Sequence, residues 1–151
     1  MLIRVCFVCL LLVWVFVFCY EAAASDARVV RVIDGDTLVV SSSEFSGRVR
    51  LIGVNAPEIS KSECFAQEAK SALYGLVYGR FVSLSTDRGR FDKYGRLLAY
   101  VSVGGTDVNV WLARNGFVKY MFVAPNFARM RVIKSAVYSA IRDNKGLWYD
   151  C

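Results

Sequence analysis

Three short segments that lie far apart in the sequence carry charged and polar side chains able to do chemistry. They are Asp34-Gly35-Asp36-Thr37, the stretch from Arg50 to Asn55-Ala56-Pro57-Glu58, and Asp92-Lys93-Tyr94-Gly95-Arg96. Each has an ordinary structural explanation by itself, because such Asp-Gly and Tyr-Gly sequences are typical of solvated turns and an arginine is common on a strand surface. Their combination indicates a reactive site.

The combination supplies the parts that hydrolysis of a phosphodiester requires. The carboxylate of Asp36 and the amide oxygen of Asn55 are hard donors of the kind that Ca²⁺ prefers. Arg50 and Arg96 can form forked hydrogen bonds to one phosphate. Glu58 can orient or deprotonate a water molecule. A metal ion, two guanidinium groups and a carboxylate base therefore predict phosphodiester hydrolysis that needs no histidine.

The composition excludes other mechanisms and indicates an anionic partner. The chain of 151 residues contains no histidine, which excludes Ser-His-Asp triads, Cys-His pairs and histidine zinc sites. Its formal net charge is +6. A basic surface favours phosphate-rich partners such as nucleic acid, or an anionic membrane or cell wall.

The first 24 residues are far more apolar than the rest. Val5 to Tyr20 form an uninterrupted apolar run of sixteen, preceded by Arg4 and followed by Ala22-Ala23-Ala24. This is the pattern of a secretory signal peptide that is cleaved after Ala24. We expect residues 1–24 to be a signal peptide and residues 25–151 to be one secreted or periplasmic domain. The alternative is an uncleaved membrane anchor, although the apolar run is slightly short for a spanning helix.

Export would leave two cysteines in the mature chain. Cys6, Cys9 and Cys19 lie in the predicted signal peptide, whereas Cys64 and Cys151 remain. An even pair in an oxidising compartment favours a disulfide that ties the C-terminus to the middle of the domain. Two unpaired thiols are the alternative.

The hydrophobic pattern predicts three strands, a helix, two strands and two helices. The strands are expected at 29–33, 37–40, 48–54, 81–85 and 96–103, and the helices at 63–78, 107–115 and 126–144. The expected buried helix faces consist of Phe65, Ala69, Ala72, Leu73 and Leu76 in the first helix and Met130, Ile133, Ala136, Val137 and Ile141 in the last. Short clustered strands with a helix after the third suit a small closed barrel capped by helices. They argue against a parallel sheet of alternating strands and helices.

Arg50 and Asn55 can meet only if the chain bends between or beside them. Being five positions apart, they point to opposite faces of a regular strand. We expect the bend at Asn55-Ala56-Pro57, because Pro57 restricts Ala56 to extended geometry.

The same segments resemble the staphylococcal nuclease, or thermonuclease, family. The similar motifs are Arg-Val-Ile-Asp-Gly-Asp-Thr (31–37), Arg-Leu-Ile-Gly-Val-Asn-Ala-Pro-Glu (50–58) and Asp-Lys-Tyr-Gly-Arg-Leu-Leu-Ala-Tyr (92–100). Val108-Asn109, the stretch 112–116 and Gly146-Leu147-Trp148 also fit, so the resemblance covers nearly all of 29–148. It implies an α+β fold: an OB-fold five-stranded β-barrel with three helices. It also implies a secreted Ca²⁺-dependent nuclease that cuts DNA and RNA and leaves 3′-phosphate ends.

The resemblance assigns a metal site with one departure from the family pattern. Asp36 resembles the first metal carboxylate, Asn55 occupies the second ligand position, and the backbone carbonyl of Ala56 would be a further ligand. The best-known member has an aspartate where this chain has Asn55. The loss of one formal charge should weaken metal binding and admit a change of preference from Ca²⁺ to Mg²⁺ or Mn²⁺.

The resemblance also assigns the groups that act on the phosphate. Arg50 resembles the arginine that binds the phosphate and stabilises the pentacoordinate transition state. Arg96 resembles its partner on the 5′-oxygen side. Glu58 resembles the glutamate that activates or positions the attacking water.

Further residues resemble substrate contacts. Lys93 and Tyr94 resemble contacts to a terminal phosphate or a neighbouring nucleotide. Where the family has paired tyrosines before a proline-containing loop, this chain has Tyr120 and Phe122 before Pro125. Aromatic rings at these positions can stack on bases.

Two other functions remain open alongside a nuclease. The first is a module that binds nucleic acid without cutting it, which only Asn55 favours. Asp36, Glu58, Arg50 and Arg96 argue against it, because binding alone does not require a pocket of paired carboxylates and arginines. A secreted protein that binds anionic wall or membrane polymers would explain the charge but none of the three motifs. In each case we expect a monomer with no obligate protein partner, and contact with a membrane only if the signal is not cleaved.

Overall fold

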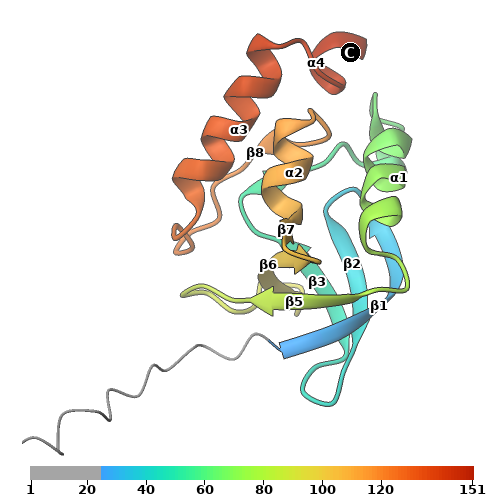
Figure 1. Ribbon diagram of the computed structural model, residues 1–151, viewed down its shortest axis with the longest axis vertical. Helices are drawn as coiled ribbons and strands as arrows, with labels where there is room; N and C mark the ends of the chain where they lie inside the picture. The colour runs from blue at the N-terminus through green and yellow to red at the C-terminus, as the bar shows by residue number, and fades with distance from the viewer. Residues whose placement is uncertain (1–24) are drawn as a thin grey trace, which may run out of the picture.

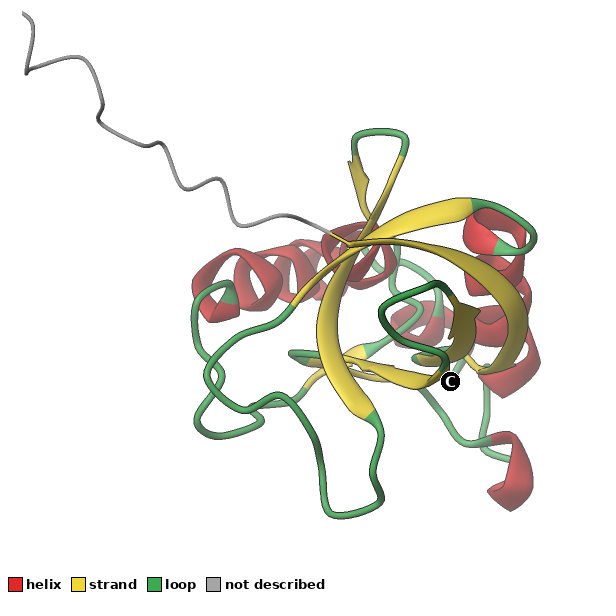
Figure 2. Cartoon of the chain, turned by 90° about the horizontal axis from the view of Figure 1, so that it is seen from below, coloured by secondary structure: helices red, strands yellow, loops and turns green. Residues whose placement is uncertain are grey.

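A closed five-stranded barrel forms the body of the molecule in the computed structural model, which describes residues 25–151. The strands are β1 (Ser25–Asp34), β2 (Thr37–Ser41), β3 (Gly47–Leu51), β5 (Phe81–Ser85) and β6 (Leu97–Val103). They pair in the order β3-β2-β1-β5-β6, and a parallel pairing of β3 with β6 closes the barrel. Figure 2 shows the strands curling around the barrel interior. The predicted OB-fold barrel of the α+β class is confirmed.

Three two-residue strands add to the predicted pattern. β7 (Thr106–Asp107) extends the barrel sheet next to β6. β4 (Val54–Asn55) pairs antiparallel with β8 (Lys119–Tyr120) in a separate small sheet. This small sheet holds the chain just after β3 against the segment that leads into the last long helix.

Within residues 25–151 the helices are shorter than predicted. They are α1 (Ala66–Val77), α2 (Val108–Arg114), α3 (Met130–Arg142) and the single turn α4 (Leu147–Asp150), together with the 3₁₀ turn η1 (Ile59–Lys61). Phe65 has a left-handed backbone with φ of 70°, so α1 begins after it. The segment before Met130 is a turn with a bridge between Val123 and Asn126, so α3 begins four residues later than expected.

The prediction of buried faces was right for part of α3. Ile133, Ala136 and Val137 are buried as expected, whereas Met130 and Ile141 are 38% and 39% exposed. Both lie in the terminal turns of α3.

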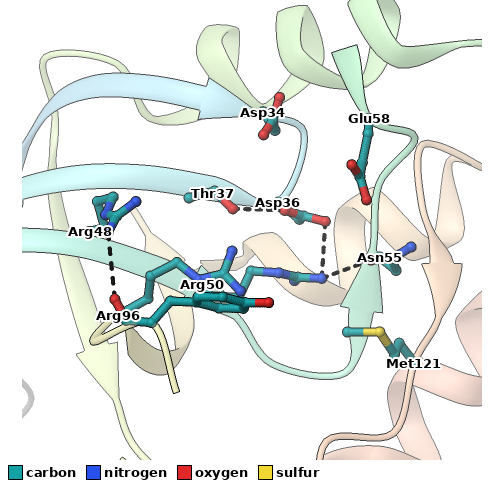
Figure 3. A pocket seen from close by; sticks show the side chains of 10 residues that line it. Asp34, Asp36, Thr37, Arg48, Arg50, Asn55, Glu58, Arg96 and Met121 are labelled. Carbon is teal, nitrogen blue, oxygen red and sulfur yellow. Dashed lines mark hydrogen bonds and ion pairs between the residues drawn. The ribbon is translucent and has the colours of Figure 1, made fainter. Parts of the chain in front are cut away.

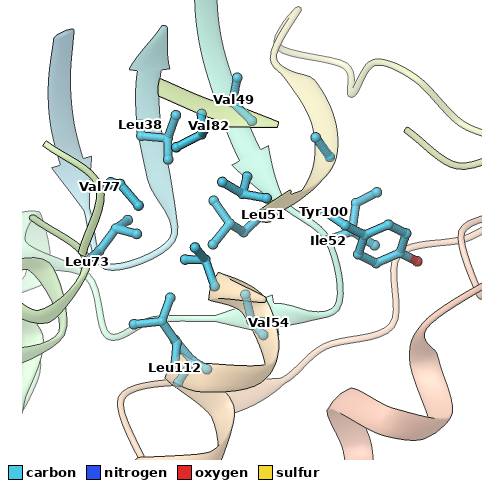
Figure 4. Close-up of a cluster of buried hydrophobic side chains, with 14 of the residues drawn as sticks. Leu38, Val49, Leu51, Ile52, Val54, Leu73, Val77, Val82, Tyr100 and Leu112 are labelled. Carbon is cyan, nitrogen blue, oxygen red and sulfur yellow. The ribbon is translucent and has the colours of Figure 1, made fainter. Parts of the chain in front are cut away.

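The core fills the barrel and the space under the helices. Leu38, Val49 and Leu51 come from the strands, and Leu73 and Leu112 come from α1 and α2; all are fully buried (Figure 4). In Figure 1, α2 lies between α1 and α3, and it packs against both. The barrel and helices therefore share one core, which gives the strand ends a rigid support.

A disulfide joins Cys64 to Cys151, with the two Cα atoms 6.0 Å apart. Cys64 lies between η1 and α1, so the bond ties the extreme C-terminus to the segment that leads into α1. No helix among residues 25–151 is long and apolar enough to cross a membrane. The predicted signal peptide at 1–24 lies outside the described residues.

Removal of the disulfide by Cys64→Ser together with Cys151→Ser should lower the free energy of unfolding by about 4 kcal/mol. The bond closes a loop across a sequence separation of 87 residues, and a loop of that length restricts the unfolded chain strongly. Urea unfolding followed by tryptophan fluorescence measures the change. An unfolding free energy equal to that of the unmodified protein would contradict the prediction.

Candidate active site

The buried guanidinium of Arg50 lies at the centre of the predicted site. Its Nη1 donates to the carbonyl oxygens of Leu51 and Val54, each at 2.7 Å. Its Nη2 donates to Asn55 Oδ1 at 3.0 Å and lies 3.1 Å from Asp36 Oδ2. One side chain thus holds both the turn after β3 and the Asp36 carboxylate.

Burial lowers the pKa of Arg50, and the nearby Arg96 adds to that effect while Asp36 opposes it. An arginine remains charged in proteins even so. The buried positive charge therefore needs the Asp36 carboxylate beside it, because an unpaired buried charge is strongly destabilising.

The strand register brings the first two motifs together. In the pairing of β2 with β3, Thr37 lies opposite Arg50. The N–H of Leu51 donates to the carbonyl oxygen of Asp36 at 3.0 Å. The Asp-Gly-Asp turn is therefore fixed beside the end of β3 by backbone pairing.

The bend between Arg50 and Asn55 occurs earlier than predicted. The chain turns at Ile52-Gly53, where Gly53 has φ of +82°, and the short strand β4 follows at once. A left-handed backbone at this position favours glycine. The prediction of a bend at Asn55-Ala56-Pro57 was wrong, because the left-handed turn at Gly53 reverses the side on which later side chains point.

Asn109 on α2 holds this turn in place, a role that the sequence did not reveal. It is fully buried; its Nδ2 donates to the carbonyl of Ile52 at 2.8 Å, and its Oδ1 accepts from the N–H of Val101 at 3.0 Å. A buried amide with both ends paired fixes the turn between β3 and β4 against β6. The Val108-Asn109 pair in the sequence was the available signal.

Asp36 connects the first motif to Ala56. Its Oδ1 accepts from Thr37 Oγ1 at 2.8 Å, and its Oδ2 accepts from the N–H of Ala56 at 2.7 Å. Gly35 allows this approach, because a Cβ there would lie 2.8 Å from the Cβ of Ala56 and 2.6 Å from that of Ala69 on α1. The predicted metal ligands Asp36, Asn55 and Ala56 are thus held as one group.

Asp34 is a second acidic group in the pocket, to which sequence reasoning assigned no role. Figure 3 shows it beyond Asp36 with no hydrogen bond to the other side chains drawn. Burial raises the pKa of Asp34, and the negative charges of Asp36 and Glu58 raise it further, while Lys70 and Arg50 oppose them. The two aspartates flank one glycine, and that spacing was the signal for the second acid.

Glu58 points from the segment after β4 toward Asp36 and Asn55 (Figure 3). Its Oε1 also forms an ion pair with Lys61 Nζ at 3.0 Å, and its side chain is 44% exposed. An exposed ion pair of this kind contributes little free energy, so it restrains the carboxylate only weakly. The predicted water-activating group is therefore beside the predicted metal ligands.

The third motif joins the site through the closing strand pair. Val49 lies opposite Leu97 in the parallel β3–β6 pairing, and Arg48 and Arg96, which directly precede these two residues, both line the pocket. The Nε of Arg96 donates to Asp92 Oδ2 at 2.7 Å. Burial opposes the charge of Asp92, but hydrogen bonds from the Arg96 backbone and side chain outweigh it and lower the pKa of Asp92.

These residues surround one pocket of about 480 Å³. Its lining includes the predicted residues Asp36, Arg50, Asn55, Glu58, Tyr94 and Arg96, together with Asp34, Thr37, Arg48 and Met121. In Figure 3 the Arg50 guanidinium lies between Asp36 and Asn55, Asp34 and Glu58 lie beyond Asp36, and Arg48 and Arg96 lie on the opposite side of the pocket. Arg48 precedes Arg50 by two positions on β3, and this alternation was the signal for it.

The remaining predicted residues lie outside this lining. The Nζ of Lys93 sits 5.0 Å from the centre of the Tyr94 ring. Tyr120 is half-buried against the core, and Phe122 is 51% exposed in a separate depression. Met121, between these two aromatic residues, is the one that reaches the pocket.

The oxygen donors in the pocket fit a hard cation, because the ligand set of such a cation can include neutral oxygens as well as carboxylates. In residues 25–151 no three His, Cys, Asp or Glu side chains are close enough to form a metal site by themselves. The Asp36 carboxylate and the Asn55 amide oxygen meet at the same Arg50 nitrogen, and Asp34 adds a negative charge. Carboxylate, amide and carbonyl oxygens are the ligands that Ca²⁺ accepts.

Known proteins resemble this chain along most of its length. The family model described as "Staphylococcal nuclease homologue" matches residues 48–150. The chain belongs to the staphylococcal nuclease family. The thermonuclease of Staphylococcus intermedius is 34% identical over 138 residues, which cover 85% of this chain and 82% of that protein. An uncharacterized endonuclease of Escherichia coli O157:H7 is 31% identical over 138 residues, which cover 89% and 86%.

The match to the staphylococcal nuclease model includes two of the three site segments. Arg50 to Glu58 and Asp92 to Arg96 lie inside residues 48–150, whereas Asp34 and Asp36 precede them. The β2–β3 register nevertheless joins all three segments in one pocket. The acidic turn is therefore part of this site by geometry as well as by sequence.

The substitution Asp34→Asn should raise the urea midpoint at neutral pH, because it removes a charge that burial and two neighbouring acids disfavour. Because the pKa of Asp34 is raised in the folded state, folding favours its protonated form. The stability that this gives is complete below the ordinary carboxyl pKa and is lost as pH rises through the folded pKa, where Asp34 ionises. The gain should therefore vanish at pH below about 4. Unfolding curves across pH 3 to 7 measure it, and a gain that does not depend on pH would refute this explanation.

Proposed function

We propose that this chain is a secreted Ca²⁺-dependent nuclease that hydrolyses phosphodiesters of DNA and RNA and leaves 3′-phosphate ends. The observation that carries the proposal is the pocket in which Asp34, Asp36 and Glu58 face Arg50 and Arg96. The names of its relatives, thermonuclease and endonuclease, support the same reaction class.

Glu58 accepts a proton from a water molecule that attacks the phosphorus. Its position beside Asp36 and Asn55, with only an exposed lysine as partner, leaves its carboxylate accessible to solvent. As the new phosphorus–oxygen bond forms, the bond to the 5′-oxygen breaks. The 5′-oxygen takes up a proton and leaves as a hydroxyl, and the phosphate remains on the 3′ side.

The arginines stabilise the charge that develops on the phosphate. Arg50 contributes mainly through its fixed positive charge, because its Nη atoms already hold Leu51, Val54 and Asn55. In Figure 3 the guanidinium of Arg96 reaches the pocket from the side opposite the acidic groups, while its Nε is held by Asp92. Its terminal nitrogens are thereby aimed for a forked contact with a phosphate.

Asp36, Asn55 and the Ala56 carbonyl would hold the cation, with Asp34 adding negative charge nearby. A bound Ca²⁺ ion supplies charge stabilisation for the phosphate oxygens. Mg²⁺ and Mn²⁺ are alternative ions. Because Asn55 is neutral, this set carries one charge less than a set with a second carboxylate.

Substrate contacts, location and oligomeric state complete the proposal. Tyr94 lines the pocket with Lys93 beside its ring, a pairing suited to a phosphate next to a nucleotide. Tyr120 and Phe122 offer aromatic faces near the pocket through their neighbour Met121. We also propose export directed by residues 1–24, and action as a monomer without an obligate protein partner.

The purified protein should release nucleotides from single-stranded DNA with Ca²⁺, and a chelator should abolish the release. Glu58→Gln and Arg96→Ala should each lower the rate at least about a hundredfold, because each removes a group that acts on the reacting phosphate. Glu44→Gln and Arg114→Ala are matched controls, since both residues are exposed and lie outside the pocket lining. Circular dichroism confirms folding of every variant.

Unchanged rates in folded Glu58→Gln and Arg96→Ala would overturn the mechanism. Retention of DNA without cleavage by any of Ca²⁺, Mg²⁺ or Mn²⁺ would instead support a binding module, the alternative that the neutral Asn55 favours.

The substitution Asn55→Asp should strengthen Ca²⁺ binding severalfold, because it adds a charge to the ligand set. Isothermal titration with Ca²⁺ measures the affinity directly, without requiring cleavage. Asn115→Asp is the matched control, since Asn115 lies outside the pocket lining and bonds to the carbonyl of Trp111. Equal strengthening by both substitutions would assign the effect to net charge alone.

A further inference from the structure

A second surface, formed by α3 and the loop before it, combines exposed aromatic rings with cations. We call it the aromatic–basic track and define it as Phe122, Phe127, Arg131, Lys134 and Tyr138. One depression of about 540 Å³ is lined by Phe122, Phe127, Ala128, Met130 and Arg131. A second of about 450 Å³ is lined by Arg131, Lys134, Ser135, Tyr138, Ser139 and Arg142. Arg131 lines both depressions.

The aromatic rings of the track are exposed on a loop that is firmly held. Phe122 and Phe127 are 51% and 44% exposed. Between them, Asn126 is 2% exposed; its Oδ1 accepts from the N–H of Gly89 at 2.7 Å and its Nδ2 donates to the same residue's carbonyl at 3.1 Å. The N–H of Ala128 donates to Asp87 at 2.8 Å. The exposure of these rings is therefore a feature of an ordered loop.

Cations accompany the rings along the whole track. The guanidinium of Arg88 lies 4.3 Å from the centre of the Phe127 ring. The Nζ of Lys134 lies 5.8 Å from the Tyr138 ring and 6.0 Å from the Tyr120 ring. The helix α3 contains three cations and no acidic residue. This face therefore attracts a polyanion that also has flat apolar groups.

The track is linked to the candidate pocket through two consecutive residues. Met121 lines the pocket, and the next residue, Phe122, lines the first depression. From there Arg131 to Arg142 extend along α3 for about 16 Å, given a rise of 1.5 Å per residue. That length matches roughly five stacked nucleotides at 3.4 Å each. A chain that leaves the pocket past Phe122 would meet the track directly.

We propose that the aromatic–basic track binds the single-stranded part of a nucleic acid that continues beyond the reacting phosphate. Arg131 and Lys134 bind phosphates, while Phe127 and Tyr138 stack on unpaired bases. Paired bases would not present their faces to these rings, which is why the track selects single strands. This inference rests on the proposed function, because it assigns an extended substrate to the same site.

The test measures binding in the presence of a chelator, so that cleavage is not required. The affinity of the purified protein for a twelve-nucleotide single strand is compared with its affinity for a dinucleotide. Arg131→Gln with Lys134→Gln should weaken binding of the longer strand about tenfold and change dinucleotide binding by less than about twofold. The slope of log affinity against log salt should become shallower by about 1.4, because two phosphate contacts are lost.

Arg28→Gln with Arg31→Gln is the matched control, because these exposed cations of β1 give the same change of net charge outside the track. Tyr138→Leu tests stacking and should weaken binding of the long strand at least about fivefold. Tyr149→Leu is its control, since Tyr149 is 77% exposed and lies outside the track.

Equal losses in the two double variants would assign binding to net charge and overturn the proposal. It would also be overturned if Tyr138→Leu had no effect while heparin competed as well as DNA, because the surface would then bind polyanions without reading bases. Failure of the protein to cleave any substrate, with the binding results as expected, would refute the nuclease function and leave the track in place. Failure of the protein to bind single strands would overturn the track.

Discussion

The buried contact between Arg50 and Asp36 is the interaction on which the rest of the site depends. The guanidinium also holds the carbonyls of Leu51 and Val54 and the amide oxygen of Asn55. Two charges removed from water are stabilising only when their geometry and remaining hydrogen bonds are satisfied. The turn after β3 and the acidic turn before β2 meet those conditions together. Displacing either turn would leave the buried charge of Arg50 or of Asp36 without its partner.

That constraint explains how a small barrel holds so many charges in one pocket. Three sources of order converge there: the β2–β3 register, the parallel β3–β6 pairing that closes the barrel, and the buried amide of Asn109. Backbone pairing fixes the strand ends, and Asn109 fixes the turn between them. Burial and the negative charges of Asp36 and Glu58 disfavour ionised Asp34, and a cation bound among these acids would offset that repulsion.

The site and the aromatic–basic track have a common support. The small β4–β8 sheet joins Asn55 to Lys119, and the chain then passes through Met121 and Phe122 to α3. The candidate pocket and the surface proposed for an extended strand are thus connected by a few residues of the chain.

The sequence by itself determined the barrel, the order of its main elements, and the three segments that carry the chemistry. Alternating apolar residues reveal strands, and turn residues reveal where they end, because both effects are local. It did not reveal the bend at Gly53, the role of Asn109, or the start of α3 at Met130. Each of these depends on contacts between residues distant in the chain, such as Asn109 with Ile52. Only the tertiary structure decided which charges face one another, because a polar side chain has the same local pattern whether it meets solvent or a partner from another strand.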